Sequence, residues 1–203
     1  MINVDIPRLS FDGIQFRHCF SFTYSLQSSS THTSISSSFD ATGLEDYINF
    51  GKQEPTVSST VIRNRTEFNS IPLDVEDLWI GRFDTSDVSE FSPSRFQSLK
   101  TLVIGNGCFG KVRVFELDGL SELESVVIGE SGIRIDRKER NDGSYRIVNC
   151  PKLKSIQIGY HSFEDYHSFE LNNLPSLQSI DMGEDNFEYA ISFSLTGLID
   201  ELV

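Results

Sequence analysis

Four ionisable side chains, all within residues 161–167, could carry acid–base chemistry or bind a metal ion. They are His161, Glu164, Asp165 and His167. Imidazole and carboxylate groups serve as metal ligands and as general acids and bases. His161 and Glu164, however, fall in the predicted turn between two strand-forming runs, where polar side chains are expected because the backbone is solvated. We therefore interpret all four as ordinary surface residues and predict neither a catalytic residue nor a metal site.

The segment Ile104–Val112 contains the spacing G-x-G-x-x-G, which lets backbone N–H groups approach a phosphate. It resembles the glycine-rich loop of protein kinases. Kinase chemistry also requires a lysine on the next strand but one, an H-R-D loop and a D-F-G site. No lysine lies between Lys111 and Lys138, and neither tripeptide occurs. The following run, Val112–Leu117, is β-like rather than helical, which argues against a dinucleotide-binding turn. We predict no cofactor and no enzymatic activity, and a nucleotide-binding enzyme is the weakest alternative.

The overall charge and the N-terminal residues argue against nucleic acid and membranes as partners. Thirty acidic and 17 basic residues leave a net charge of −13, which repels phosphate backbones and anionic lipid. Residues 1–12 lack a basic stretch followed by an apolar run, and no segment approaches the roughly 18–20 apolar residues that span a bilayer. We expect a soluble, acidic protein without an export signal or a membrane span, and we favour the cytoplasm as its compartment.

The cysteines give no sign of disulfide or metal chemistry. Cys19, Cys108 and Cys150 are an odd number at long spacings, which fits neither a disulfide framework nor a zinc site. We interpret them as buried thiols.

The histidines, carboxylates, glycine-rich segment and cysteines from residue 99 onward lie within a repeat of about 24 residues, which must determine their positions. Its first half places Leu, two aliphatic residues or Met, and Gly at positions 1, 4, 6 and 7, as in Leu99-Leu102-Ile104-Gly105, Leu123-Val126-Ile128-Gly129, Leu153-Ile156-Ile158-Gly159 and Leu177-Ile180-Met182-Gly183. A weaker copy begins at Val75, so the units start at residues 75, 99, 123, 153 and 177. A unit this short cannot surround its own apolar side chains, whereas stacked units can. The pattern therefore predicts a repeat protein whose core forms by stacking.

Each unit is predicted to contain a pair of short strands. The first ends at position 6, and the second lies in the recurring runs Val114–Leu117, Ser144–Ile147, Ser168–Leu171 and Ser192–Leu195. The first strands of successive units should pair in parallel about 4.8 Å apart. This pairing would place Ile104, Ile128, Ile158 and Met182 in one line. The glycine at position 7 is expected to end each first strand by adopting a backbone angle that other residues resist.

The string L-x-x-I-x-I-G-x-x-x-F, read in LKSIQIGYHSF (153–163) and LQSIDMGEDNF (177–187), resembles the first half of a leucine-rich repeat, L-x-x-L-x-L-x-x-N-x-L. It looks most similar to the variant repeats of bacterial and protist surface-antigen-type proteins. The family's asparagine at position 9 is replaced by Phe83, Gly107, Ser131, His161 and Asp185. The resemblance covers about residues 66–203 and implies a mainly β, curved solenoid that binds macromolecular partners through its strand face and carries no chemistry. We place the solenoid domain at residues 61–203.

Residues 1–60 are predicted to form a less regular, β-containing segment ahead of the solenoid. Residues 14–26 alternate apolar and polar side chains, which is typical of a strand. Residues 27–38 are dominated by Ser and Thr and are expected to form a loop. The domain boundary is therefore placed between residues 60 and 61.

Position 5 of each unit should point away from the core and form a column on an exposed face. The column contains Trp79, Val103, Val127, Gln157 and Asp181, bordered at position 8 by Arg82 and Tyr160. An exposed apolar stripe with a Trp is typical of a protein interface. We therefore predict a non-catalytic protein-binding module, with this column as the candidate partner site. The alternative is that the N-terminal segment covers the stripe.

Two further features concern possible partners. The 30-residue unit contains an insertion with the basic residues Arg134, Arg137, Lys138 and Arg140. Its loop is expected to be solvated, or else to dock an acidic partner. The last unit ends at Asp200 without a polar cap, which would leave a bare stacking surface. The second functional hypothesis is accordingly a structural, self-associating array or a fragment of a longer one.

Overall fold

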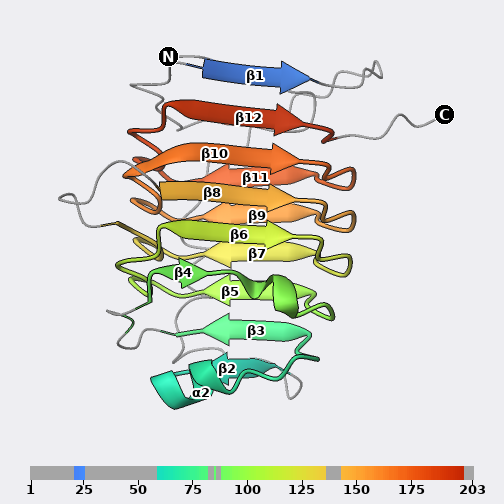
Figure 1. Ribbon diagram of the computed structural model, residues 1–203, viewed down its shortest axis with the longest axis vertical. Helices are drawn as coiled ribbons and strands as arrows, with labels where there is room; N and C mark the ends of the chain where they lie inside the picture. The colour runs from blue at the N-terminus through green and yellow to red at the C-terminus, as the bar shows by residue number, and fades with distance from the viewer. Residues whose placement is uncertain (1–20, 26–58, 82–84, 86–87, 136–142, 199–203) are drawn as a thin grey trace.

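The computed structural model describes residues 21–25, 59–81, 85, 88–135 and 143–198. This part of the chain is mainly β, with two six-stranded parallel sheets (Figure 1). Its helical content is one short α-helix, α2 (Arg65–Asn69), and one 3₁₀ turn, η1 (Pro93–Arg95). The predicted mainly β class and the parallel pairing of strands are confirmed.

The strands β2 and β3 both belong to the first sheet, and from β3 onward successive strands belong alternately to the two sheets. The first sheet has the order β11-β9-β7-β5-β3-β2 and the second has the order β1-β12-β10-β8-β6-β4. The strands of the first sheet are β2 (Thr60–Ile62), β3 (Asp77–Ile80), β5 (Thr101–Ile104), β7 (Ser125–Ile128), β9 (Ser155–Ile158) and β11 (Ser179–Met182). Those of the second are β1 (Ser21–Ser25), β4 (Glu90–Phe91), β6 (Val114–Asp118), β8 (Gly143–Val148), β10 (Tyr166–Asn172) and β12 (Ser192–Thr196).

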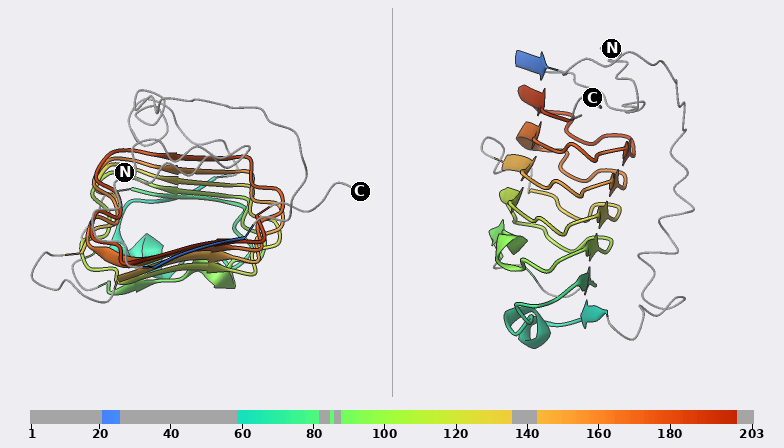
Figure 2. Two further views of the ribbon diagram at one scale, coloured as in Figure 1. Left: turned by 90° about the horizontal axis from the view of Figure 1, so that it is seen from above. Right: turned by 90° about the vertical axis from the view of Figure 1, so that its right-hand side faces the viewer.

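From β3 onward each unit supplies one strand to each sheet, so the chain alternates between the sheets and successive turns lie over one another (Figure 2). The pairing keeps the repeat in register. Ile104 pairs with Ile128, Ile128 with Ile158, and Ile158 with Met182. The predicted line of position-6 residues is therefore confirmed.

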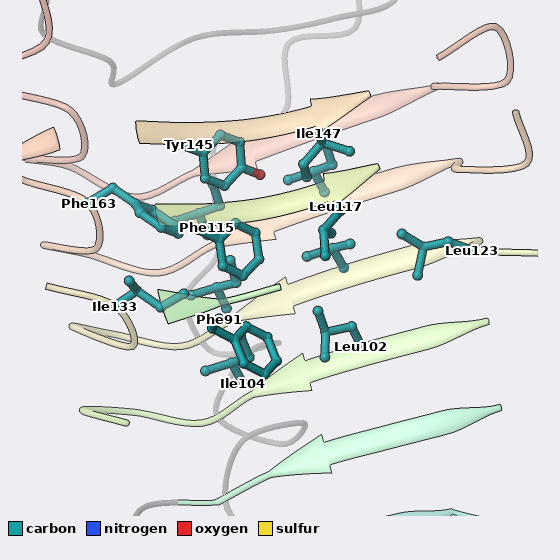
Figure 3. Packing of buried hydrophobic residues seen from close by; sticks show 14 of the residues in the cluster. Phe91, Leu102, Ile104, Phe115, Leu117, Leu123, Ile133, Tyr145, Ile147 and Phe163 are labelled. Carbon is teal, nitrogen blue, oxygen red and sulfur yellow. The ribbon is translucent and has the colours of Figure 1, made fainter. Parts of the chain in front are cut away.

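The core lies between the two sheets and contains an aromatic column along the second sheet. Phe91, Phe115, Tyr145, Phe169 and Phe193 follow one another with ring centroids 6.1, 5.3, 5.0 and 4.4 Å apart and interplanar angles of 25°, 13°, 3° and 3°. Phe163 packs edge-on against Tyr145 at 4.7 Å (Figure 3). Parallel pairing in register produces this column because it places equivalent side chains above one another.

The repeated glycine at position 7 has a different role from the predicted one. Among the described residues, glycines with positive φ are Gly107, Gly119 and Gly197, and the repeated glycine is not among them. The reason for glycine is space: a Cβ on Gly159 would lie 2.6 Å from the backbone nitrogen of Glu130, in the turn below. The residue that adopts the left-handed backbone conformation lies two positions after the glycine, as His161 does (φ 56°). Close stacking of turns therefore excludes a side chain at position 7.

Both ends of the second sheet are covered by elements outside the regular units. At one end, Phe68 of α2 packs 6.1 Å from Phe91 and so extends the aromatic column. At the other end, β1 pairs in parallel with β12, which confirms the predicted strand in 14–26 for Ser21–Ser25. The last-layer residues Phe187 and Leu198 are buried. The predicted bare stacking surface at the last unit is therefore wrong, because strand pairing and burial remove it from water.

The boundary drawn between residues 60 and 61 falls inside β2, which begins at Thr60. The strand β1 belongs to the same sheet as the second strands of the units. The Ser/Thr-rich residues 27–38 lie outside the described part of the chain.

Candidate binding surfaces

The outer face of the first sheet carries the position-5 column predicted as a partner site. The structure places its side chains away from the main core, and Val103, Val127 and Trp79 pack together as a separate cluster. Val103 is 0% and Val127 6% exposed, so the prediction that they are exposed is wrong. Branched apolar side chains on the outer side of a sheet lose contact with water as soon as this face is covered. The apolar part of the column is therefore not a free surface.

The polar part of the same column is half-buried, as are Trp79 and the neighbouring Tyr160. Register places Gln157 between Val127 and Asp181. Arg82 lies outside the described residues, and so do segments 1–20 and 26–58, which were considered as a cover. The alternatives of an interface and an internal cover therefore both stay open for this column.

The cluster around residue 164 contains buried carboxyl groups rather than the predicted surface residues. Glu164 is 3% and Asp165 0% exposed, whereas His161 and His167 are half-buried. Arg134 places its Nη2 atom 3.2 Å from Oε2 of Glu164. This arginine from the insertion thus balances a buried charge, which explains why an acid is tolerated there. The other basic residues of the insertion, Arg137, Lys138 and Arg140, lie outside the described residues.

The described ranges contain no group of three or more His, Cys, Asp and Glu side chains that could hold a metal ion. The glycine-rich segment forms a turn whose N–H groups bond to neighbouring turns. Gly105 donates to the carbonyl of Ile80, Gly107 to that of Glu130, and Phe109 to that of Gly132. These three N–H groups therefore form hydrogen bonds between stacked turns, whereas a nucleotide-binding loop would offer its N–H groups to phosphate.

Position 10 of the unit forms a buried polar ladder that the sequence analysis did not identify. Ser162 Oγ donates to the carbonyl of Gly129, and Asn186 Nδ2 donates to the carbonyls of Gly159 and Gly183. These side chains satisfy turn carbonyls that stacking buries. In the sequence, the indication of this ladder is the polar residue at position 10, Ser162 or Asn186, one position after the site where leucine-rich repeats carry asparagine. The ladder is structural because its donors bond the chain's own backbone.

The outer face of the second sheet is mainly polar, although Val114 is 37% exposed, and it carries a charge cluster centred on one arginine. Arg146 on β8 contacts Glu116 and Asp118 on β6 and Glu170 on β10. Its Nη1 atom lies 3.2 Å from Oδ2 of Asp118, and its Nε atom lies 3.1 Å from Oε2 of Glu170. The hydrogen bond to Glu116 is the largest cause that raises the pKa of Arg146. We refer to these four residues as the Arg146 cluster.

The Arg146 cluster was missed because its members come from three units and share no local motif. The side chains of Glu116, Arg146 and Glu170 become neighbours through strand register alone. Beside them run the half-buried hydroxyls of Ser144, Ser168 and Ser192. The sequence signal was the recurring polar position between Phe or Tyr and Leu or Ile in each second strand. This face therefore presents regular rows of polar side chains to solvent.

Replacing Arg146 with alanine should lower the free energy of unfolding by about 1 kcal/mol at low salt, because three carboxylates would then face one another. The value is modest because more than a third of the arginine side chain is exposed. Urea unfolding at about 0.02 M and 1 M NaCl measures the effect, which salt should reduce. Glu170→Gln, which removes one partner, serves as the milder control. An Arg146→Ala chain as stable as the parent at low salt would contradict the stabilising role.

Cys108 and Cys150 are buried, as predicted, while Cys19 lies outside the described residues. Burial raises the pKa of the Cys150 thiol from 9.0 to about 11. Since the thiolate is the reactive form, this shift alone lowers its fraction at pH 8 about 100-fold. In a Cys19→Ser chain, the Cys150 thiol should therefore react with Ellman's reagent at least about 100-fold more slowly when folded than in urea, and burial should also slow the reaction of Cys108. Rapid labelling of folded Cys150 would show that the site opens.

No family model, no curated protein and no solved structure matches this chain. Within the described ranges, none of the helices has the length and apolar character that crossing a membrane would require.

Proposed function

We propose that this chain is a non-catalytic protein-binding module, built as a β-solenoid, that docks a partner on the outer face of its second sheet. The solenoid is supported by the alternation of strands between two sheets and by the register that repeats from unit to unit. The leucine-rich-repeat resemblance covers the first strand of each unit. The second half of the unit forms another strand, where leucine-rich repeats use a helix or 3₁₀ turn.

The observation that carries this proposal is the contrast between the two outer faces. On the first sheet, the apolar residues Val103 and Val127 are already buried. On the second, Ser144, Ser168 and Ser192 are half-buried and stand in one row. Side chains that a rigid ladder holds in place lose little conformational entropy on binding, which favours such a face as a docking surface. We therefore assign the partner site to the second sheet.

The charges of this face suggest a partner with basic side chains. The Arg146 cluster contains three carboxylates and one guanidinium, so its net charge is −2. The chain as a whole carries −13, which would speed the approach of a basic partner at low salt. A regular polar surface of this kind offers carboxylates and hydroxyls at strand-to-strand spacing. Lysine or arginine side chains of a partner could pair with them.

The test compares substitutions on the two faces. Ser168→Arg and Ser192→Arg together place two bulky cations on the second sheet, whereas Thr101→Arg and Ser155→Arg form the matched pair on the first sheet, where the residues are also half-buried. Captured proteins are identified by mass spectrometry from cells that express the chain. We expect a specific partner to be lost at least about tenfold with the second-sheet pair and retained with the first-sheet pair. Equal retention by both, with both chains folded, would refute the assignment.

The alternative of a self-associating array is less well supported by the geometry. End-to-end stacking requires an open last layer, but Phe187 and Leu198 are buried there. The edge of β12 is also already paired with β1. A protein-binding module therefore accounts better for a chain in which the edge of β12 is already paired and these last-layer core residues are buried.

A further inference from the structure

The strand β1 occupies the place of one more second strand. Its sequence, Ser21-Phe22-Thr23-Tyr24-Ser25, copies the order Ser, aromatic, polar, apolar, polar found in β12 (Ser192-Phe193-Ser194-Leu195-Thr196). The register aligns the two strands residue by residue, with Phe22 beside Phe193 and Tyr24 beside Leu195. The same order recurs in β10 from Ser168 to Asn172. The edge of β12 therefore accepts a strand with the pattern of the repeat itself.

A long stretch of sequence separates β1 from the next described strand. The next described strand in the sequence is β2, which lies at the opposite end of the stack (Figure 1). Thirty-four residues separate Ser25 from Thr60. An extended chain of that length can reach about 110 Å, whereas the six strand spacings between the levels of β2 and β1 amount to about 29 Å. The tether is thus several times longer than the stack that it must pass.

We propose that the edge of β12 is a strand-docking site and that the β1 strand of a second copy can occupy it, which gives a strand-exchanged dimer. The same backbone pairing with β12 forms whether β1 comes from its own chain or from a second copy. The balance then depends on the protein concentration relative to the effective concentration of the tethered strand, which we take to be on the order of millimolar. Reciprocal exchange between two identical chains closes as a two-fold dimer rather than a fibre. This inference does not depend on the proposed partner face.

Disulfide trapping in the full chain tests the proposal, with Cys19 replaced by serine throughout. The register places Thr23 beside Ser194, so cysteines at these positions are one strand spacing apart, within the range that a disulfide bridges. The Thr23→Cys/Ser194→Cys chain reports pairing within one molecule. A mixture of Thr23→Cys chains and Ser194→Cys chains reports exchange between molecules. Ser168→Cys in place of Ser194→Cys is the control, because β12 lies between β10 and β1.

We expect the double variant to form its internal disulfide at low concentration. In the mixture, the cross-linked heterodimer should increase about tenfold between about 0.05 and 0.5 mM protein, as expected below the effective concentration of the tether. The Ser168→Cys mixture should stay at background. An internal disulfide without a concentration-dependent heterodimer would overturn the exchange, and the absence of both products would overturn the docking site itself. Neither result bears on capture of a partner by the second-sheet face.

Discussion

Alanine in place of Gly159 is expected to reduce the free energy of unfolding by about 3 kcal/mol or more. An added Cβ would lie 2.6 Å from the nitrogen of Glu130 and 2.7 Å from the carbonyl carbon of Gly129. Both atoms belong to the backbone of the turn below, so no side-chain rotation can relieve the clash. The turn could move only by stretching the hydrogen bond from Gly159 to Ile128, which measures 2.7 Å. Overpacking of this kind lies at the high end of the usual cost.

Urea unfolding followed by circular dichroism measures this effect. Gly110→Ala is the matched control, because a Cβ at Gly110 would meet no atom within 4 Å. Alanine at that position should change the free energy of unfolding by no more than about 0.5–1 kcal/mol. Equal stability of the two variants would show that the turns do not pack as closely as the structure indicates.

Removing the ring of Phe169 is expected to cost about 3–5 kcal/mol, the range for deleting a buried phenylalanine. The ring stacks 5.0 Å from Tyr145 and 4.4 Å from Phe193, and it lies edge-on to Phe187 at 4.7 Å. Phe169→Ala would interrupt the aromatic column and leave a cavity between layers. The loss includes both hydrophobic transfer and stacking interactions with three neighbouring rings.

Ile191→Ala provides the control for the aromatic column, because Ile191 is 40% exposed. Its loss should be below about 1 kcal/mol. Phe169→Leu should be intermediate, since it retains most of the buried volume but loses the stacking. Thermal and urea unfolding of the three variants would give this order. If Phe169→Ala were no more harmful than Ile191→Ala, the column would not contribute to the core.

The candidate sites were less predictable than the elements that carry them. The direction of the position-5 column followed from the alternation of side chains along a strand, and the structure agrees for Val103 and Val127. Their burial did not follow, because it depends on what covers the outer side of the sheet. Similarly, Glu164 was assigned to a solvated turn, yet it is buried and paired with Arg134 from the preceding unit. Sequence spacing gives no measure of such contacts between turns.

Local periodicity by itself determined the strands, their parallel direction and their register. The 24-residue spacing makes equivalent residues such as Ile104 and Ile128 partners as soon as units stack. Tertiary structure alone decided the features that join distant parts of the chain. It placed β1 beside β12, assembled the Arg146 cluster from β6, β8 and β10, and left no room for a Cβ at Gly159 beside the backbone of the neighbouring turn. The physical reason is that a repeat specifies neighbours one unit apart, whereas ends, outer faces and close backbone contacts depend on the complete three-dimensional arrangement.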